Sequence, residues 1–177
     1  MKTFLKIIGG ILLLIVVYAL IAMVAFGKVY RYEKSMVMNA PVEKVWMQIS
    51  SMKAFNQWNP WMKLDPGMKI IYGGNSGKVG DKYCWDSKDD EAGAGCQEIK
   101  ELVVNKKQKT EMIFIKPFEG QAISEIILTP EGNATKVTWT METEQDAMMK
   151  IMRPFMDYQM GKSYQEGLSN LKNLVEK

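Results

Sequence analysis

The chain has 177 residues, a formal net charge of +3, two cysteines and no histidine. Without histidine, Ser-His-Asp and Cys-His catalysis and histidine-based metal sites are excluded. The basic excess lies beside an apolar span near the N-terminus and leaves residues 35–177 close to neutral, so this part has no electrostatic footprint for nucleic acid.

Residues 7–26 form one uninterrupted apolar span without a charge. At 1.5 Å per residue, such a span matches a hydrocarbon core about 30 Å thick. The alternative is a cleaved signal peptide, whose apolar core is usually about 7–15 residues, and Met23-Val24-Ala25 is a poor cleavage site. We therefore expect residues 1–6 to be a short tail, 7–26 a transmembrane helix and 29–177 a separate domain. Basic residues flank both ends of the span and leave its orientation open.

The first part of the domain predicts a strand and two short helices. Residues 29–38 alternate as a strand does, beginning about three residues beyond the span. After Pro41, apolar residues at positions 42, 45, 46 and 49 have helical spacing. A second helix is expected from Met52 to about Trp58, because the residue before Pro60 disfavours helical geometry.

The rest of the chain predicts a meander followed by a long helix. Turn compositions separate six expected strands, at 68–73, 79–87, 94–104, 109–116, 120–129 and 134–144. Beyond residue 146 the period changes, and we expect Pro154 to open the last helix. Gly161 and Gly167 each weaken that helix by about 1 kcal/mol relative to alanine, so packing or a ligand must compensate. The fold class is α+β, with an antiparallel sheet whose apolar face must be filled by side chains or by a ligand.

The two cysteines fall on neighbouring predicted strands. If strands 79–87 and 94–104 pair so that residue numbers sum to 180, Lys82 faces Glu98 and Cys84 faces Cys96. The opposite charges support this register by up to about 1 kcal/mol. A disulfide and two free thiols are both open, and a disulfide would indicate a domain outside the cytoplasm.

Strand alternation assigns a set of apolar side chains to the inner face of the sheet, when charged residues are placed outside. These side chains are the candidate lining of a ligand cavity, and a dry core is the alternative. The inner strand positions are Tyr83, Trp85, Gln97, Ile99, Met112, Phe114, Ala122, Ser124, Ile126, Val137, Trp139 and Met141, and the last helix adds Tyr164 and Leu168.

No catalytic residue is expected, because the strand carboxylates Asp86, Glu98, Glu101, Glu111 and Glu125 fall on the outer face in this register. The glycine-rich segment 73–80 lacks P-loop spacing, and the acidic loop 86–91 lacks calcium-loop spacing. We therefore expect no cofactor and no metal site.

Several motifs, in this order and spacing, resemble the START-like superfamily, also called SRPBCC or Bet v 1-like, in particular its bacterial polyketide cyclase/dehydrase-type members. The matching segments are residues 40–46, Trp58-Asn59-Pro60-Trp61, Gly80-Asp81-Lys82-Tyr83-Cys84-Trp85, 93–95, 134–141 and 167–172. The resemblance implies a helix-grip fold, in which a curved sheet wraps the C-terminal helix around an apolar cavity. Family members bind lipids, sterols and polyketides, and a minority catalyse cyclisation or dehydration.

These observations together predict a single-pass protein of the bacterial cell membrane that binds a hydrophobic small molecule or lipid without catalysis. Its expected partners are that ligand and, through residues 7–26, the membrane; nucleic acid is not expected, and a protein partner is not identified. The tryptophans Trp46, Trp58 and Trp61 are expected either as a cavity lid or as packing. The alternatives are a polyketide cyclase or dehydratase and a protein-interaction module of the same fold.

Overall fold

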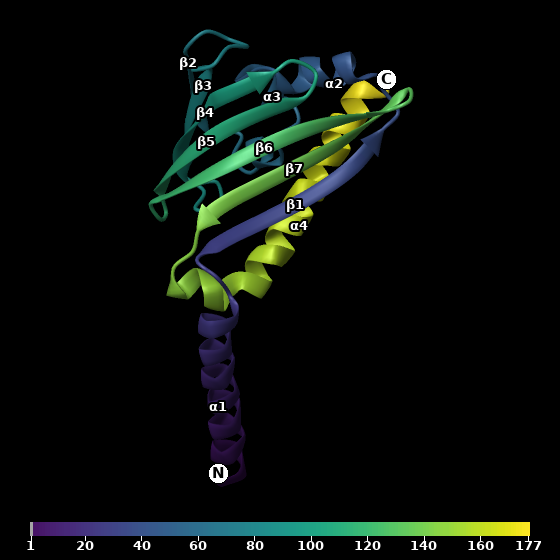
Figure 1. Cartoon of the computed structure of the whole chain (residues 1–177). Coiled ribbons are helices and arrows are strands. Elements are labelled where there is room, and N and C mark those ends of the chain that lie inside the picture. Colours follow the sequence, from purple (N-terminus) through teal and green to yellow (C-terminus); the bar gives the residue numbers. More distant parts are fainter. Residues whose placement is uncertain (1) are drawn as a thin grey trace.

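The computed structural model describes residues 2–177 and contains one apolar N-terminal helix, a seven-stranded sheet and a long C-terminal helix (Figure 1). The predicted α+β helix-grip fold is confirmed. In chain order the elements are α1 (Lys2–Ala25), β1 (Val29–Met38), α2 (Val42–Ile49), α3 (Met52–Phe55), the 3₁₀ helix η1 (Pro60–Lys63), β2 (Lys69–Gly73), β3 (Lys82–Asp86), β4 (Ala94–Val103), β5 (Lys107–Lys116), β6 (Gly120–Glu131), β7 (Ala134–Glu144) and α4 (Ala147–Val175).

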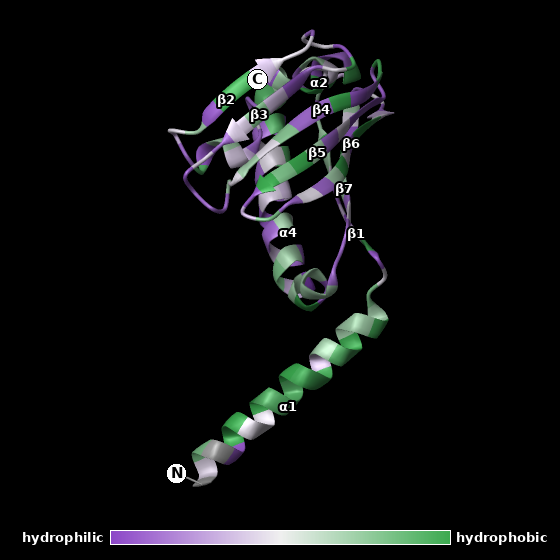
Figure 2. Cartoon of the chain, turned by 90° about the vertical axis from the view of Figure 1, so that its left-hand side faces the viewer, coloured by the Kyte–Doolittle hydropathy of each residue, from purple (hydrophilic) through white to green (hydrophobic). Residues whose placement is uncertain are grey.

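Helix α1 projects away from the sheet and is hydrophobic along most of its length (Figure 2). Most of its large apolar side chains are exposed. Its segment Lys6–Ala25 has a mean hydropathy of 3.0 and is, among the described residues, the one helix long and apolar enough to cross a membrane. A signal sequence near an N-terminus can have the same length and hydropathy.

The link between α1 and β1 is short and is held by Gln145, just beyond the end of β7. The Gln145 side-chain amide donates to the carbonyls of Gly27, at 2.8 Å, and Val29, at 3.3 Å. Its backbone N–H donates to the carbonyl of Lys28 at 2.8 Å. Gln145 therefore holds the last two residues of the link and the first residue of β1 against the end of β7.

The sheet order is β1-β7-β6-β5-β4-β3-β2, and all neighbours are antiparallel. The predicted six-strand meander is therefore confirmed, with β1 added beside β7. Two strand starts differ from the prediction by more than one residue. Strand β3 begins at Lys82, because Gly77 and Gly80 adopt positive φ angles in the preceding turn, and β5 already begins at Lys107.

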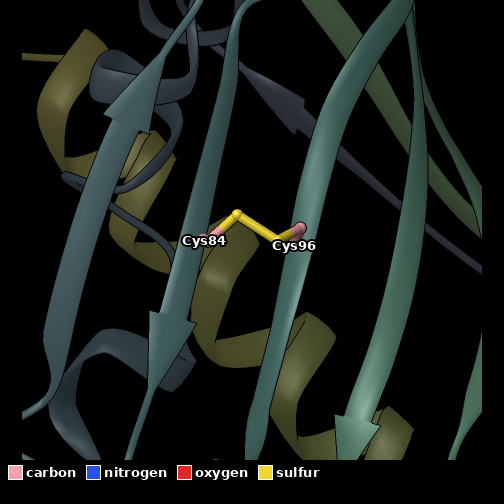
Figure 3. The surroundings of a disulfide bond; sticks show 2 residues. All are labelled: Cys84 and Cys96. Atoms are coloured by element: carbon pink, nitrogen blue, oxygen red, sulfur yellow. A yellow bond between two sulfur atoms is a disulfide. The ribbon is translucent and has the colours of Figure 1, made fainter.

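The register predicted between β3 and β4 is also confirmed, since Lys82 pairs with Glu98 and Cys84 with Cys96. The two cysteines form a disulfide that joins the strands (Figure 3). The five strand carboxylates predicted to face outward all pair with lysines: Asp86 with Lys116, Glu98 and Glu111 with Lys100, Glu101 with Lys107, and Glu125 with Lys109.

Helix α4 begins seven residues earlier than predicted. Asp146 caps it by accepting a hydrogen bond from the backbone N–H of Met149 at 2.8 Å, so Pro154 lies inside the helix rather than at its start. A proline inside a helix removes one backbone hydrogen bond and favours a bend. The first turns of α4 do run at an angle to the remainder of the helix (Figure 1).

The second predicted helix is shorter than expected, because α3 ends at Phe55. The chain then turns, and the Asn59 side chain caps the 3₁₀ helix η1 by accepting a hydrogen bond from the backbone N–H of Trp61. An aromatic cluster follows from this geometry. The rings of Trp139 and Tyr164 stack at 4.1 Å between centroids, while Phe55, Trp58 and Trp61 approach Trp139 edge to face.

Candidate functional site

A cavity of about 1350 Å³ lies between the inner face of the sheet and the first half of α4. It reaches from the stacked pair Trp139 and Tyr164 to the end of the domain where β1 begins and β7 ends. Its wall is mostly apolar. Ligand sites in proteins commonly measure about 300–1,000 Å³, so the volume is sufficient for a large hydrophobic molecule.

Of the fourteen side chains named above as candidate lining, eight border the cavity from β3 to β7 and α4: Tyr83, Trp85, Met112, Phe114, Ser124, Trp139, Met141 and Tyr164. The inner-face residues Gln97 and Ala122 line it as well. Strand alternation thus identified the correct face of the sheet along β3 to β7.

The other four predicted residues, Ile99, Ile126, Val137 and Leu168, lie outside the cavity and are fully buried in the hydrophobic core. They point to the same side of the sheet or helix as the lining residues, but they lie toward the end that α2 covers. Helix α2 contacts β6, β7 and α4 there, and its Val45 and Ile49 side chains fill the space. The correction is therefore one of position along the strands, not of face.

The sequence interpretation missed the cavity wall contributed by the first turns of α4. These turns supply Met148, Met149, Met152, Phe155, Met156 and Met160. The segment precedes or flanks Pro154, where we expected the helix only to begin. The methionine spacing of 148, 152, 156 and 160 is helical and was a signal that could have placed them.

The three tryptophans considered as lid or packing have different roles. Trp61 lines the cavity, whereas Trp58 is buried in the core and donates from Nε1 to the Gln48 carbonyl at 2.9 Å. Trp46 is partly buried and packs against the core cluster.

Polar groups on the deep wall are hydrogen-bonded to one another. The Tyr83 hydroxyl donates to Gln97 Oε1 at 3.2 Å, and Gln97 Nε2 donates to the Thr110 hydroxyl at 2.8 Å. In a second group, Trp139 Nε1 donates to Ser124 Oγ at 2.9 Å, and that hydroxyl donates to the Thr140 carbonyl at 2.8 Å. A ligand reaching this wall therefore meets groups that already have partners.

Ionisable groups are distributed so that charge stays at the cavity mouth. Desolvation by burial raises the pKa of Tyr83 and of Tyr164, so both phenols remain protonated at neutral pH. The carboxylates that border the cavity are all exposed: Glu91, Glu119, Glu142, Glu144 and Asp146. Within the described part of the chain, no group of three or more His, Cys, Asp or Glu side chains could hold a metal ion.

Solved structures with the same fold come from varied sources. A Chromobacterium violaceum protein is 21% identical, with a TM-score of 0.59 and coverage of 85% of this chain and 98% of that one. A Nitrosospira multiformis protein is 20% identical, with a TM-score of 0.60 and coverage of 82% and 96%. The di-domain ARO/CYC StfQ of the steffimycin biosynthetic pathway is 9% identical, with a TM-score of 0.63 and coverage of 84% and 51%.

At these low sequence identities, the structures show that the fold is shared and do not assign a function. A search of curated proteins finds no match. The family model described as "Polyketide cyclase / dehydrase and lipid transport" matches residues 30–176, which is nearly all of the chain beyond α1. The chain therefore belongs to the polyketide cyclase/dehydrase and lipid transport family, within the Bet v 1-like fold.

Proposed function

We propose that this protein is held in a membrane by α1 and binds a hydrophobic small molecule or lipid in the cavity, without catalysing a reaction. The observation that carries the proposal is the cavity itself, about 1350 Å³ in volume with a largely apolar wall. An apolar cavity of this size is typical of a ligand site. Water inside it would form few hydrogen bonds with the wall, so an apolar ligand displaces that water favourably.

The hydrogen bonding of the wall supports an apolar ligand body. The Tyr83, Gln97 and Ser124 side chains all have protein partners. A polar ligand group buried against them would lose its hydrogen bonds to water without gaining equivalent ones, at a cost of about 1–3 kcal/mol. Charged groups of a ligand are favoured only at the mouth, where the bordering side chains are exposed.

Binding is favoured over catalysis by the distribution of acids and bases. A cyclase or dehydratase of this fold would need an acid or base beside the reacting atoms, deep in the cavity. In the described residues, the carboxylates bordering the cavity are exposed at its mouth, and the ionisable groups on the deep wall are phenols with raised pKa values. A protein-interaction module would have no evident use for a cavity of this volume.

Membrane attachment is supported by the length, hydropathy and exposed apolar surface of α1. The Cys84–Cys96 disulfide supports a domain on the non-cytoplasmic side, because cytosolic thiols usually stay reduced.

The proposal is tested on full-length protein purified in two different detergents, with ligands identified by native mass spectrometry and solvent extraction. Two adjacent substitutions on β5 separate cavity from surface. Met112→Glu puts a carboxylate on the cavity wall, whereas Ile113→Glu puts the same group on the exposed outer face of the same strand.

We expect a bound amphiphile in the wild-type protein and in Ile113→Glu, and its loss in Met112→Glu, because a charge in an apolar wall disfavours both the ligand and its own burial. Thermal unfolding of both variants shows whether the fold is retained. A cavity that is empty in wild-type protein from both detergents, or a ligand kept equally by Met112→Glu, would contradict the proposal.

A further inference from the structure

The first turns of α4 lie against the C-terminal part of α1, and both views show the two helices side by side there (Figures 1 and 2). The Tyr18 hydroxyl donates to the Ile151 carbonyl at 3.1 Å. The Arg153 guanidinium lies 4.8 Å from the ring centroid of Phe26 and 5.0 Å from that of Tyr30. Contacts therefore reach from the domain back along the apolar helix.

These contacts fix the depth of the α4 segment relative to α1. Tyr18 precedes Phe26 by eight residues, which corresponds to about 12 Å along a helix axis. A tyrosine side chain plus one hydrogen bond is shorter than that distance. The Ile151 carbonyl therefore lies at or below the level at which the apolar span ends, not above it in the aqueous part of the molecule.

The same segment presents an unpartnered apolar stripe. Met148, Met152 and Phe155 are spaced i, i+4 and i+7, so they share one helix face, and they are 65%, 42% and 56% exposed. All three also border the cavity. Apolar surface is thus continuous from the outside of α4 into the cavity.

Basic side chains accompany this stripe at the end of the span. Lys150 and Arg153 are half-buried on α4, and Lys28 follows α1 directly. Lysine and arginine can cover apolar surface with their stems while their charged ends reach lipid headgroups. The segment thus combines apolar and basic side chains as helices at a membrane surface do.

We propose that residues 147–155 lie in the interface of the bilayer that contains α1, so that the cavity opens onto lipid and takes a membrane-resident amphiphile directly from the bilayer. This inference rests on the proposed function, because it requires both the anchor and the ligand cavity. The stripe of Met148, Met152 and Phe155 would contact lipid, because the contacts between α1 and α4 hold it at the level of the membrane surface.

The test uses full-length protein in phosphatidylcholine vesicles, with an environment-sensitive fluorophore at Met148→Cys. The Cys84–Cys96 disulfide leaves the new thiol as the reactive one under non-reducing conditions. The matched control is Val104→Cys, at a position that is 69% exposed in the turn between β4 and β5. This turn lies at the end of the sheet opposite to the cavity mouth. Doxyl-labelled lipids then report contact with acyl chains by quenching.

We expect a blue-shifted emission and at least threefold stronger quenching at position 148 than at position 104. Equal quenching at the two positions would overturn the inference. A blue shift at 148 without quenching would mean that protein covers the stripe, and would overturn it as well.

Failure of this inference can be distinguished from failure of the proposed function. Flotation with vesicles tests the anchor, and ligand extraction tests the cavity. Protein that floats and carries ligand but shows no quenching at 148 would refute the inference alone. Strong quenching at 148 with an empty cavity would uphold the membrane contact and refute both ligand binding and entry from the bilayer.

Discussion

Gly167 has no side chain where α4 crosses the aromatic cluster, and the space a side chain needs is occupied. A Cβ atom at this position would lie 2.7 Å from Cζ3 of Trp139 and 3.1 Å from Cδ of Pro60. Trp139 cannot move freely, because its ring stacks on Tyr164 and its Nε1 is hydrogen-bonded to Ser124. Close packing thus compensates for the low helix propensity of this glycine.

We predict that Gly167→Ala destabilises the domain by about 1–3 kcal/mol, the usual cost of overpacking a core. Gly161→Ala is the matched control on the same helix, where the new Cβ meets only the Tyr32 hydroxyl, at 3.1 Å. This substitution should be neutral or stabilising by up to about 1 kcal/mol through helix propensity. Unfolding monitored in detergent measures both, and equal effects would contradict the packing argument.

Asp65 ties the loop after β3 to the turn before β2. Its carboxylate accepts hydrogen bonds from the Ser87 hydroxyl, at 2.6 Å, and from the backbone N–H groups of Gly67 and Lys88. These hydrogen bonds lower the pKa of Asp65 below its ordinary value of 3.8, and the bond from Ser87 has the largest effect. The loop that begins at Ser87 continues to Ala92 at the cavity wall.

A lowered pKa in the folded state means that Asp65 contributes stability above pH 3.8, which is lost as the pH falls through the lowered value. We predict that Asp65→Asn lowers the melting temperature at neutral pH, and that the difference from wild type narrows as the pH falls below 3.8. Thermal unfolding across a pH series checks this. A difference independent of pH would show that the ionised carboxylate is not what matters.

At the scale of elements, the β3–β4 hairpin is closed by the disulfide between Cys84 and Cys96, which are twelve residues apart in sequence. Closing a loop of this length reduces the entropy of the unfolded chain and is worth about 3 kcal/mol.

We predict that protein isolated under non-reducing conditions lacks two hydrogens relative to reduced protein by intact mass. The double variant Cys84→Ala/Cys96→Ala should lose about 3 kcal/mol of stability. A reducing agent should shift wild-type unfolding in the same direction and leave the double variant unchanged. Two free thiols in freshly isolated protein would contradict the prediction and remove the support it lends to a non-cytoplasmic domain.

The sequence was sufficient for the sheet and less so for the helices. A period of two and glycine-rich turns specify strands strongly, because a one-residue slip moves every side chain to the other face. Pro154 misled the assignment of α4, since proline favours the first turn of a helix as well as tolerating a bend inside one. The N-cap Asp146 was the signal that decided between these.

The site was predicted only up to the choice of face. Ile99 and Gln97 both point inward from β4, but Gln97 borders the cavity and Ile99 is core. The difference depends on where α2 ends its coverage of the sheet. That is a property of three-dimensional packing between distant elements, which alternation along one strand does not contain.

At the scale of the whole molecule, the arrangement of α1 depends on whether it stays attached. We predict that protein recovered from membranes keeps residues 7–26 by intact mass and stays in the membrane fraction after a high-salt wash, because an apolar span of this length inserts through hydrophobic burial. A mature protein beginning after residue 26, released in soluble form, would identify the segment as a signal peptide instead.

The link that Gln145 holds has a consequence for how the protein could work in a cell. Residues 26–28 separate α1 from β1, and three residues span at most about 10 Å. On the proposed topology, the domain cannot carry cargo across an aqueous gap to another membrane. It would stay in one membrane and reach its ligand by lateral diffusion there, so any protein that delivers or collects the ligand must come to it.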